Sequence, residues 1–244
     1  MLTPEEQKRY DRQMMIPEVG EKGQEKLKSS KVFIAGAGGL GSPIAIYLSV
    51  AGVGNIKIVD NDTVELSNLN RQILHWDEDI GKNKVDSAKH KLMKLNPSIK
   101  LDVLCETIGE DNVSELVDDS DLIIDAMDNL PTRYLLNRTA IEKDIPFFHG
   151  AVSGLEGRVM TVIPGKSACL RCSYRGQVPA EKFSVMGVTP AIIGSIQATE
   201  VIKYITGMGE LLTNRLLRYD GMSMDFHEFR VGRNPQCEDC GHLK

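Results

Sequence analysis

The sequence predicts an α/β fold with a mostly parallel, doubly wound sheet and an antiparallel C-terminal part. Up to residue 151, short apolar runs alternate with helical patterns, as they do in chains of βαβ units. Beyond that point three more strand patterns occur with one long helix among them, which favours antiparallel pairing. A chain of 244 residues can bury a full core, so we expect a single domain, 1–244.

Residues 1–30 are expected to form two helices. Thr3-Pro4-Glu5-Glu6 combines a capping side chain, a proline and two acids, which is typical of a helix start. Residues 20–30 have the pattern of a second short helix that ends at Ser29-Ser30.

A glycine-rich turn lies between a predicted strand at residues 32–35 and a predicted helix at residues 40–51. Four glycines make up this turn, three of them with G-x-G-x-x-G spacing: Gly36, Gly38, Gly39 and Gly41. Glycines at this spacing permit a tight turn, close approach of the backbone to a phosphate and close packing of helix on strand. The N-terminus of the helix offers N–H groups to an anion.

An acidic residue ends the next predicted strand, residues 55–59. Asp60 stands about twenty residues beyond the glycines, where a carboxylate can hold a ribose hydroxyl. The order strand, turn, helix, strand and acid therefore predicts a Rossmann-like nucleotide site within residues 31–151.

The remaining elements complete the predicted sheet. Helices are expected at residues 82–95, 113–117, 131–143 and 190–205, and strands at residues 99–105, 145–151, 157–163, 216–219 and 226–231. A further strand begins at Asp121 and ends in an acidic loop, Asp128-Asn129. This loop follows the carboxyl end of the strand, which is where α/β sheets place their ligands.

Charge and hydropathy argue against several classes of protein. The net charge of −5 does not suit a general binder of nucleic acid or of membrane surfaces. Residues 32–56 carry no charge, but they contain six glycines and one proline, which argue against a continuous lipid-facing helix. Since the N-terminus lacks the apolar core of a signal peptide, we expect a cytoplasmic protein.

The run that follows the second strand is more specific than the glycine turn. It consists of Asp60-Asn61-Asp62-Thr63-Val64-Glu65 and, one residue later, Ser67-Asn68-Leu69-Asn70-Arg71-Gln72. This run resembles the signature of the ThiF/MoeB/HesA family, relatives of ubiquitin-activating enzymes that adenylate a small carrier protein. The resemblance extends from Tyr10 to Cys240. It implies a compact adenylyltransferase, closest to those that serve sulfur carrier proteins or molybdopterin synthase, in molybdopterin or thiamine biosynthesis.

The resemblance implies a set of residues for ATP and Mg²⁺. The expected nucleotide-binding residues are Gly36, Gly38, Gly39, Gly41, Asp60, Ser67, Asn68, Leu69, Asn70, Arg71, Lys84, Asp128 and Asn129. Asp128 is also expected to hold Mg²⁺. The implied catalytic residues are Arg71, Lys84, Asp128 and Arg12, and Arg12 would reach the ATP phosphates of the other subunit in a homodimer.

The implied substrate is a small ubiquitin-like carrier protein with a Gly-Gly C-terminus, bound by residues 152–244. A sulfur donor such as a cysteine desulfurase is a further candidate partner. Neither nucleic acid nor a membrane is expected as a partner.

Two C-x-x-C pairs predict a structural zinc site. Cys169/Cys172 and Cys237/Cys240 have the spacing that lets each pair bind one tetrahedral ion. Disulfides are disfavoured in a reducing compartment. Four thiolates leave no open coordination position, so we expect Zn²⁺ to join these two segments. The alternative, a zinc ribbon that contacts nucleic acid, does not fit the negative charge.

One feature of many relatives is missing. They carry a cysteine between the first zinc pair and the following apolar helix, where it takes the activated carrier as a thioester or persulfide. Here residues 173–189 contain no cysteine. The fifth cysteine, Cys105, lies on a predicted strand and is interpreted as a small buried residue. Adenylation needs no cysteine, whereas a thioester or a direct sulfur relay is placed in doubt.

Simpler roles remain open for three of the implied residues. Arg12 could be a charge on a solvated helix face, Lys84 a surface lysine, and Asp128 a cap for the helix that begins near Pro131. Two other functions share the glycine turn: an NAD-dependent oxidoreductase and a non-catalytic nucleotide-binding zinc module. An oxidoreductase would not explain the combination of Arg71, Lys84 and Asp128.

Overall fold

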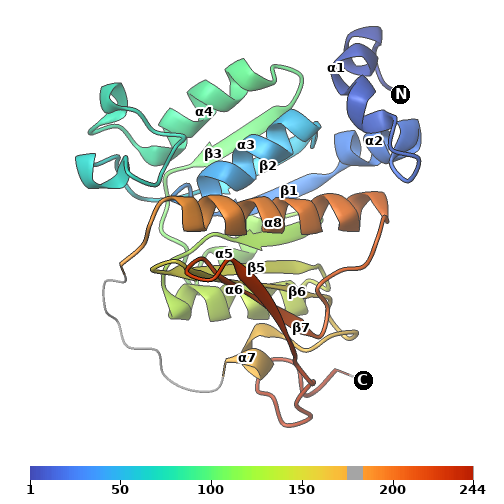
Figure 1. Ribbon diagram of the computed structural model, residues 1–244, viewed down its shortest axis with the longest axis vertical. Coiled ribbons are helices and arrows are strands. Elements are labelled where there is room, and N and C mark those ends of the chain that lie inside the picture. The colour runs from blue at the N-terminus through green and yellow to red at the C-terminus, as the bar shows by residue number, and fades with distance from the viewer. Residues whose placement is uncertain (175–183, 244) are drawn as a thin grey trace.

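The computed structural model describes residues 1–174 and 184–243, and the eight strands of this part form one sheet (Figure 1). Their order across the sheet is β3-β2-β1-β4-β5-β6-β7-β8. The parallel strands are β1 (Lys31–Ala35), β2 (Asn55–Val59), β3 (Lys100–Leu104), β4 (Leu122–Asp125) and β5 (Phe147–Ser153). The antiparallel strands, which continue from β5, are β6 (Glu156–Val162), β7 (Arg215–Asp220) and β8 (Asp225–Arg230). The predicted fold class is therefore confirmed.

Helices cover both faces of this sheet. Alternate residues of its strands point to opposite sides, and both sides are apolar, so each face forms a core with its own set of helices. On one face, Ile34 belongs to a core formed with α2 (Gly20–Ser29), α3 (Gly41–Ala51), α4 (Lys84–Leu95) and α8 (Val188–Thr206). On the other face, Phe33 belongs to a core formed with α5 (Val113–Val117), α6 (Leu130–Glu142), α7 (Leu170–Ser173) and the zinc-pair cysteines. The short helix α7 was not predicted, and the other predicted elements agree with the structure to within a few residues.

The N-terminal helix α1 (Pro4–Met14) starts as its sequence predicts. The Thr3 hydroxyl accepts a hydrogen bond from the N–H of Glu6 (3.2 Å), and the Glu6 carboxylate accepts one from the N–H of Thr3 (2.7 Å). This reciprocal pair is a capping box.

Helix α1 packs at the end of α3 that lies farther from the glycine turn (Figure 1). The side chain of Gln13 donates to the carbonyl of Ala51 (2.8 Å), the last residue of α3, and Arg9 donates to the carbonyl of Leu95 (3.2 Å), the last residue of α4. None of the helices in the described residues is both long and apolar enough to cross a membrane.

Candidate active site

The carboxyl ends of β1, β2 and β4 form one edge of the sheet. Strand β1 pairs with β2 on one side and with β4 on the other, both in parallel. The chain first adds strands on one side of β1 and then, from β4 on, adds them on the other side, so the strand order reverses between β1 and β4. Ligands of open α/β sheets bind in the crevice at such a reversal. The predicted nucleotide residues after β1, β2 and β4 therefore share one edge.

The glycine turn is in direct contact with the loop after β4. Gly36 has a φ of 103°, a left-handed conformation that other residues rarely adopt, and a β-carbon there would lie 2.8 Å from the carbonyl oxygen of Ala126. A β-carbon on Gly41 would overlap the carbonyl oxygen of Gly36. The first and third glycines are thus fixed by close packing of the turn, as the motif predicts.

Asp60 holds the turn from the side of β2. One carboxylate oxygen accepts a hydrogen bond from the N–H of Ala37 (2.7 Å), and the other accepts one from the N–H of Asp62 (2.8 Å). A carboxylate has about four acceptor positions, so capacity remains for a ribose hydroxyl.

The segment 65–72 folds back over the glycine turn. Its shape is set by Asn68, whose side-chain oxygen accepts from the N–H of Glu65 (3.0 Å), and by Arg71, whose guanidinium donates to the carbonyl of Ser67 (2.9 Å). A β-carbon placed on Gly39 would lie 3.6 Å from Cγ of Arg71. The structure therefore places a cationic side chain beside backbone that can approach a phosphate.

Lys84 is buried, with a relative exposure of 5%, so its interpretation as an ordinary surface lysine is wrong. Its ammonium nitrogen lies 2.7 Å from a carboxylate oxygen of Asp62, within the same acidic run as Asp60. Asp62 itself was not predicted as a site residue. The pair places a positive charge next to the loop that carries Asp60.

Asp128 is exposed in the loop between β4 and α6, and its interpretation as the helix cap is wrong. Asn129 caps α6 instead, because its side-chain oxygen accepts from the N–H of Thr132 (3.0 Å). Within residues 1–174 and 184–243, the Asp128 carboxylate makes no hydrogen bond or ion pair. A free carboxylate in this position suits Mg²⁺, which prefers oxygen ligands and binds through one or two carboxylates together with phosphates.

A buried polar network behind Asp128 was not predicted. The side chains of Asp125 and His149 are fully buried, and Nδ1 of His149 lies 2.7 Å from Oδ2 of Asp125. Gln197 of α8 donates to the carbonyls of Asp125 (2.9 Å) and Phe148 (3.1 Å), and so links β4 to β5. Burial lowers the pKa of His149, which favours the neutral imidazole. One indication of this network was present in the sequence: Asp125 ends a strand whose other residues are apolar.

A second unpredicted polar chain lies behind the glycine turn. Nε2 of His75 lies 2.9 Å from the carbonyl oxygen of Ala37, and Nδ1 lies 2.9 Å from the hydroxyl of Ser87, which also accepts from Lys91 (2.9 Å). Because a carbonyl can only accept, Nε2 carries the hydrogen and Ser87 donates to Nδ1. Burial lowers the pKa of His75 as well. These hydrogen bonds fix the carbonyl of Ala37, and Asp60 accepts a hydrogen bond from the N–H of the same residue.

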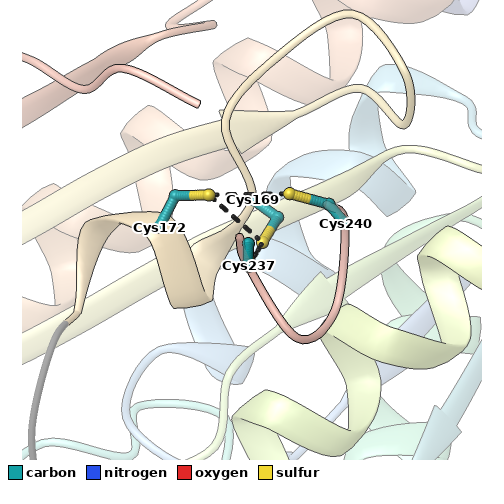
Figure 2. Close-up of side chains that lie close together, drawn as sticks. All are labelled: Cys169, Cys172, Cys237 and Cys240. Atoms are coloured by element: carbon teal, nitrogen blue, oxygen red, sulfur yellow. Dashed lines mark hydrogen bonds between the residues drawn. The ribbon is translucent and has the colours of Figure 1, made fainter. Parts of the chain in front are cut away.

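The four zinc-pair cysteines gather between α7 and the C-terminal loop (Figure 2). Their sulfur atoms lie within 4.8 Å of one another, and the closest pairs are Cys172–Cys240 at 3.5 Å, Cys169–Cys237 at 3.6 Å and Cys169–Cys172 at 3.9 Å. Zinc–sulfur bonds of about 2.3 Å in a tetrahedron place sulfur atoms about 3.8 Å apart. The cluster therefore fits Zn²⁺, and these distances are far too long for disulfides.

Among the residues expected to contact ATP or Mg²⁺, Arg12 is the one that the structure does not bring to this edge. It is exposed on α1, next to Gln13, which contacts the last residue of α3. The glycine turn lies at the other end of α3, about 15 Å away over ten residues of helix. Arg12 thus has no short path to the nucleotide site of its own chain.

Cys105 is exposed, one residue beyond the end of β3, and its interpretation as a buried residue is wrong. Strand β3 is an edge strand, and the residues at its end are only partly covered. The interval 173–189, which carries no cysteine, lies partly outside the described residues.

If the chain adenylates a carrier protein, as the resemblance implies, we predict that Cys105→Ala retains this activity and that the carrier forms no thioester with this chain. The reason is that Cys105 lies after β3, two strands away from the turn that follows β1. The measurement is non-reducing electrophoresis of the wild-type protein and of Cys105→Ala after incubation with ATP and carrier. A reducible conjugate that survives denaturation and disappears in the variant would contradict the prediction.

Comparison with known proteins gives one consistent result. The chain matches the model of the ThiF family over residues 10–239. The SAMP-activating enzyme E1 of Haloferax volcanii is 43% identical, covering 96% of this chain and 88% of its own length. The sulfur carrier protein adenylyltransferase of Thermus thermophilus is 40% identical, covering 98% and 92%. The solved structure of E. coli MccB with ATP has a TM-score of 0.83 and 26% identity, covering 90% of this chain and 68% of that one.

Proposed function

Since the chain belongs to the ThiF family, we propose that it is an enzyme that adenylates the C-terminal glycine of a small ubiquitin-like sulfur carrier protein. The carboxylate of the carrier attacks the α-phosphate of ATP, the bond to the β-phosphate breaks, and pyrophosphate leaves. The observation that carries this proposal is the segment 65–72, which lies over the glycine turn and places Arg71 beside Gly39. Relatives named as activators of sulfur carriers support the choice of substrate.

The chemistry requires neutralisation of charge, because an anionic carboxylate must approach an anionic phosphate. Arg71 would bind the phosphates through its planar guanidinium, which suits bidentate contacts, and Lys84 would add a second cation from beneath the Asp60 loop. Asp60 would hold the ribose. Asp128 would hold Mg²⁺, which would offset the charge of the phosphates. Together these groups would hold the carboxylate and the α-phosphate in line.

The proposal also covers the pathway, the domain organisation and the location of the enzyme. We assign the enzyme to molybdopterin or thiamine biosynthesis in the cytoplasm, as a single domain, with a cysteine desulfurase as the candidate sulfur donor. We assign carrier binding to residues 152–244. Support for that face comes from β8, an edge strand on which every residue is exposed, including Phe226 and Phe229.

The direct test is exchange of labelled pyrophosphate into ATP with each candidate carrier that ends in Gly-Gly. Exchange that requires both the protein and one of these carriers supports the proposal and identifies the substrate. A thermal shift separates the alternatives, because a ligand that binds only the folded state raises the melting temperature. We expect ATP with Mg²⁺ to raise it and NAD to leave it unchanged. Stabilisation by NAD alone would favour the oxidoreductase.

We further propose that the protein acts as a two-fold dimer in which Arg12 completes the site of the other subunit. Two observations support this: Arg12 is exposed, and α1 packs at the end of α3 remote from the glycine turn. In a two-fold dimer each chain gives and receives the same contact.

Complementation between two inactive variants tests this arrangement. Arg12→Ala and Asp128→Ala are each expected to be inactive alone. In a mixed dimer, one site keeps its own Asp128 and receives the partner's Arg12. Random mixing makes about half of the dimers mixed, each with one good site of two, so exchange activity should recover to about a quarter of wild type.

Subunit exchange is verified first with two different affinity tags on the variants. If Arg12 acted within its own chain, every site of a mixed dimer would lack one residue and activity would stay near zero. No recovery after verified exchange would therefore contradict the role of Arg12 across the interface.

A further inference from the structure

A path of polar contacts runs from Tyr174, beside the cysteine cluster, to the loop that carries Asp128. It begins at Tyr174, two residues after the zinc-pair residue Cys172, at the end of α7. The hydroxyl of Tyr174 lies 3.3 Å from Nε2 of His149. Since Nδ1 of His149 must donate to the carboxylate of Asp125, Nε2 of the neutral ring accepts a hydrogen bond from Tyr174.

The path continues from Asp125 to the backbone next to Asp128. The second oxygen of Asp125 accepts a hydrogen bond from the N–H of Met127 (3.0 Å), and Nε of Arg133 donates to the carbonyl of Met127 (3.1 Å). Nε of Arg133 also lies 3.6 Å from Asp125. The backbone of Met127 is thus held on both sides, and Asp128 is the next residue.

Tyr174 is itself held at several points. Its carbonyl accepts from the hydroxyl of Tyr134 (3.0 Å), its ring packs edge-on against His149 at 5.5 Å between centroids, and the guanidinium of Arg158 lies 6.0 Å from its centroid. A shift of α7 would therefore move the tyrosine hydroxyl relative to His149. Since Cys172 lies in α7 and Cys169 is the residue just before it, the place of α7 depends on the cluster.

Packing of β4 against β5 does not explain this network. Asp125 and His149 are fully buried, and burying polar groups costs free energy that an apolar pair of similar size would avoid. Directional hydrogen bonds instead select one backbone conformation for the loop. Residues that bind a metal are commonly oriented by hydrogen bonds from groups behind them, and loss of such a group weakens metal binding.

We propose that Tyr174, His149, Asp125 and Arg133 are positioning residues that set the orientation of Asp128 toward Mg²⁺ and ATP. The zinc cluster then acts on the adenylation site through Tyr174, in addition to joining the C-terminal loop to the sheet. The inference rests on the proposed function, because it takes Asp128 as the magnesium residue.

The test measures the Mg²⁺ dependence of ATP binding by calorimetry, with zinc-loaded protein and without carrier. His149→Leu removes both hydrogen bonds at similar volume, and it should raise the Mg²⁺ concentration for half-maximal binding about tenfold. His149→Asn can keep the donor toward Asp125, so its shift should be smaller. Tyr174→Phe removes one hydroxyl and should shift the midpoint in the same direction, by less than His149→Leu.

Ser173→Ala is the matched control for Tyr174→Phe. Ser173 is the last residue of α7 and precedes Tyr174. Its hydroxyl is buried and has no hydrogen-bond partner among the described residues. The control should leave the Mg²⁺ midpoint unchanged and keep one zinc per chain. A loss of stability alone would not shift this midpoint, because binding is measured well below the melting temperature of each variant. If His149→Leu does not fold, Tyr174→Phe against Ser173→Ala decides.

Asp128→Ala distinguishes a failure of the magnesium assignment from a failure of the positioning role. If this variant binds Mg²⁺ and ATP like wild type, the magnesium assignment in the proposed function is wrong. If it weakens binding while Tyr174→Phe and both His149 variants match wild type, the proposed function stands and the positioning role is wrong. An equal shift in Ser173→Ala and Tyr174→Phe would also overturn the positioning role.

Discussion

Arg71→Ala and Asp128→Ala should each lower carrier-dependent exchange of pyrophosphate into ATP by about a hundredfold to a thousandfold, with the fold retained. Under the proposed function, each variant removes a charged group that contacts ATP or Mg²⁺. The free energy of unfolding should change little. Asp128 is exposed, and the hydrogen bonds of Arg71 stay within its own loop, to Ser67 and Asn70.

Two matched variants control for the loss of charge itself. Arg138 lies half-buried on α6 and pairs with the exposed Glu110, and Asp111 is exposed beyond β3. Both lie outside the nucleotide site, so Arg138→Ala and Asp111→Ala should keep full exchange. Circular dichroism and melting temperature verify that all four variants are folded. Exchange at the wild-type rate in Asp128→Ala, with the right carrier, would show that Asp128 does not hold the magnesium ion.

Loss of the zinc cluster should destabilise the protein far more than Arg71→Ala or Asp128→Ala does. Structural zinc contributes about 10 kcal/mol or more to folding in small zinc-dependent folds. Even about 3 kcal/mol would lower the melting temperature by about 6–12 °C in a chain of this size. Cys240→Ser and Cys172→Ser should therefore melt well below wild type, and elemental analysis should find about one zinc per wild-type chain.

Cys105→Ser is the matched control, since it makes the same chemical change at an exposed cysteine outside the cluster. It should keep both the zinc and the melting temperature. Freshly purified, reduced wild-type protein without zinc would contradict the prediction, and so would equal melting temperatures for Cys105→Ser and Cys240→Ser.

The sequence predicts those features that depend on local spacing. The glycine motif, the period of the apolar residues and the two C-x-x-C pairs each act within a few residues, and they were sufficient for the order of strands and helices, the turn after β1 and the cysteine cluster. The change to antiparallel strands also followed from sequence, because a crossover needs an intervening helix.

The features that were missed depend on residues far apart in the chain. Asp125, His149 and Gln197 form one network over 72 residues, and no local pattern marks a histidine on a strand as part of it. Lys84 is buried because the loop of Asp62 folds against it, which the sequence of α4 does not reveal. Cys105 was misplaced by one residue at a strand end, where its side chain turns from the sheet to solvent.

The order of the strands has a consequence for how the chain folds as it is synthesised. Strand β5 meets β6, and β7 meets β8, across short turns, so these pairs close soon after their residues emerge. Strand β1 is different: Val32 pairs with Ile56 on one side but with Leu122 on the other. At about 5–20 residues per second, the second side of β1 has no partner strand for several seconds. During that time one side of this apolar strand is open to pairing with other chains, so a nascent chain of this topology is prone to aggregate in that interval.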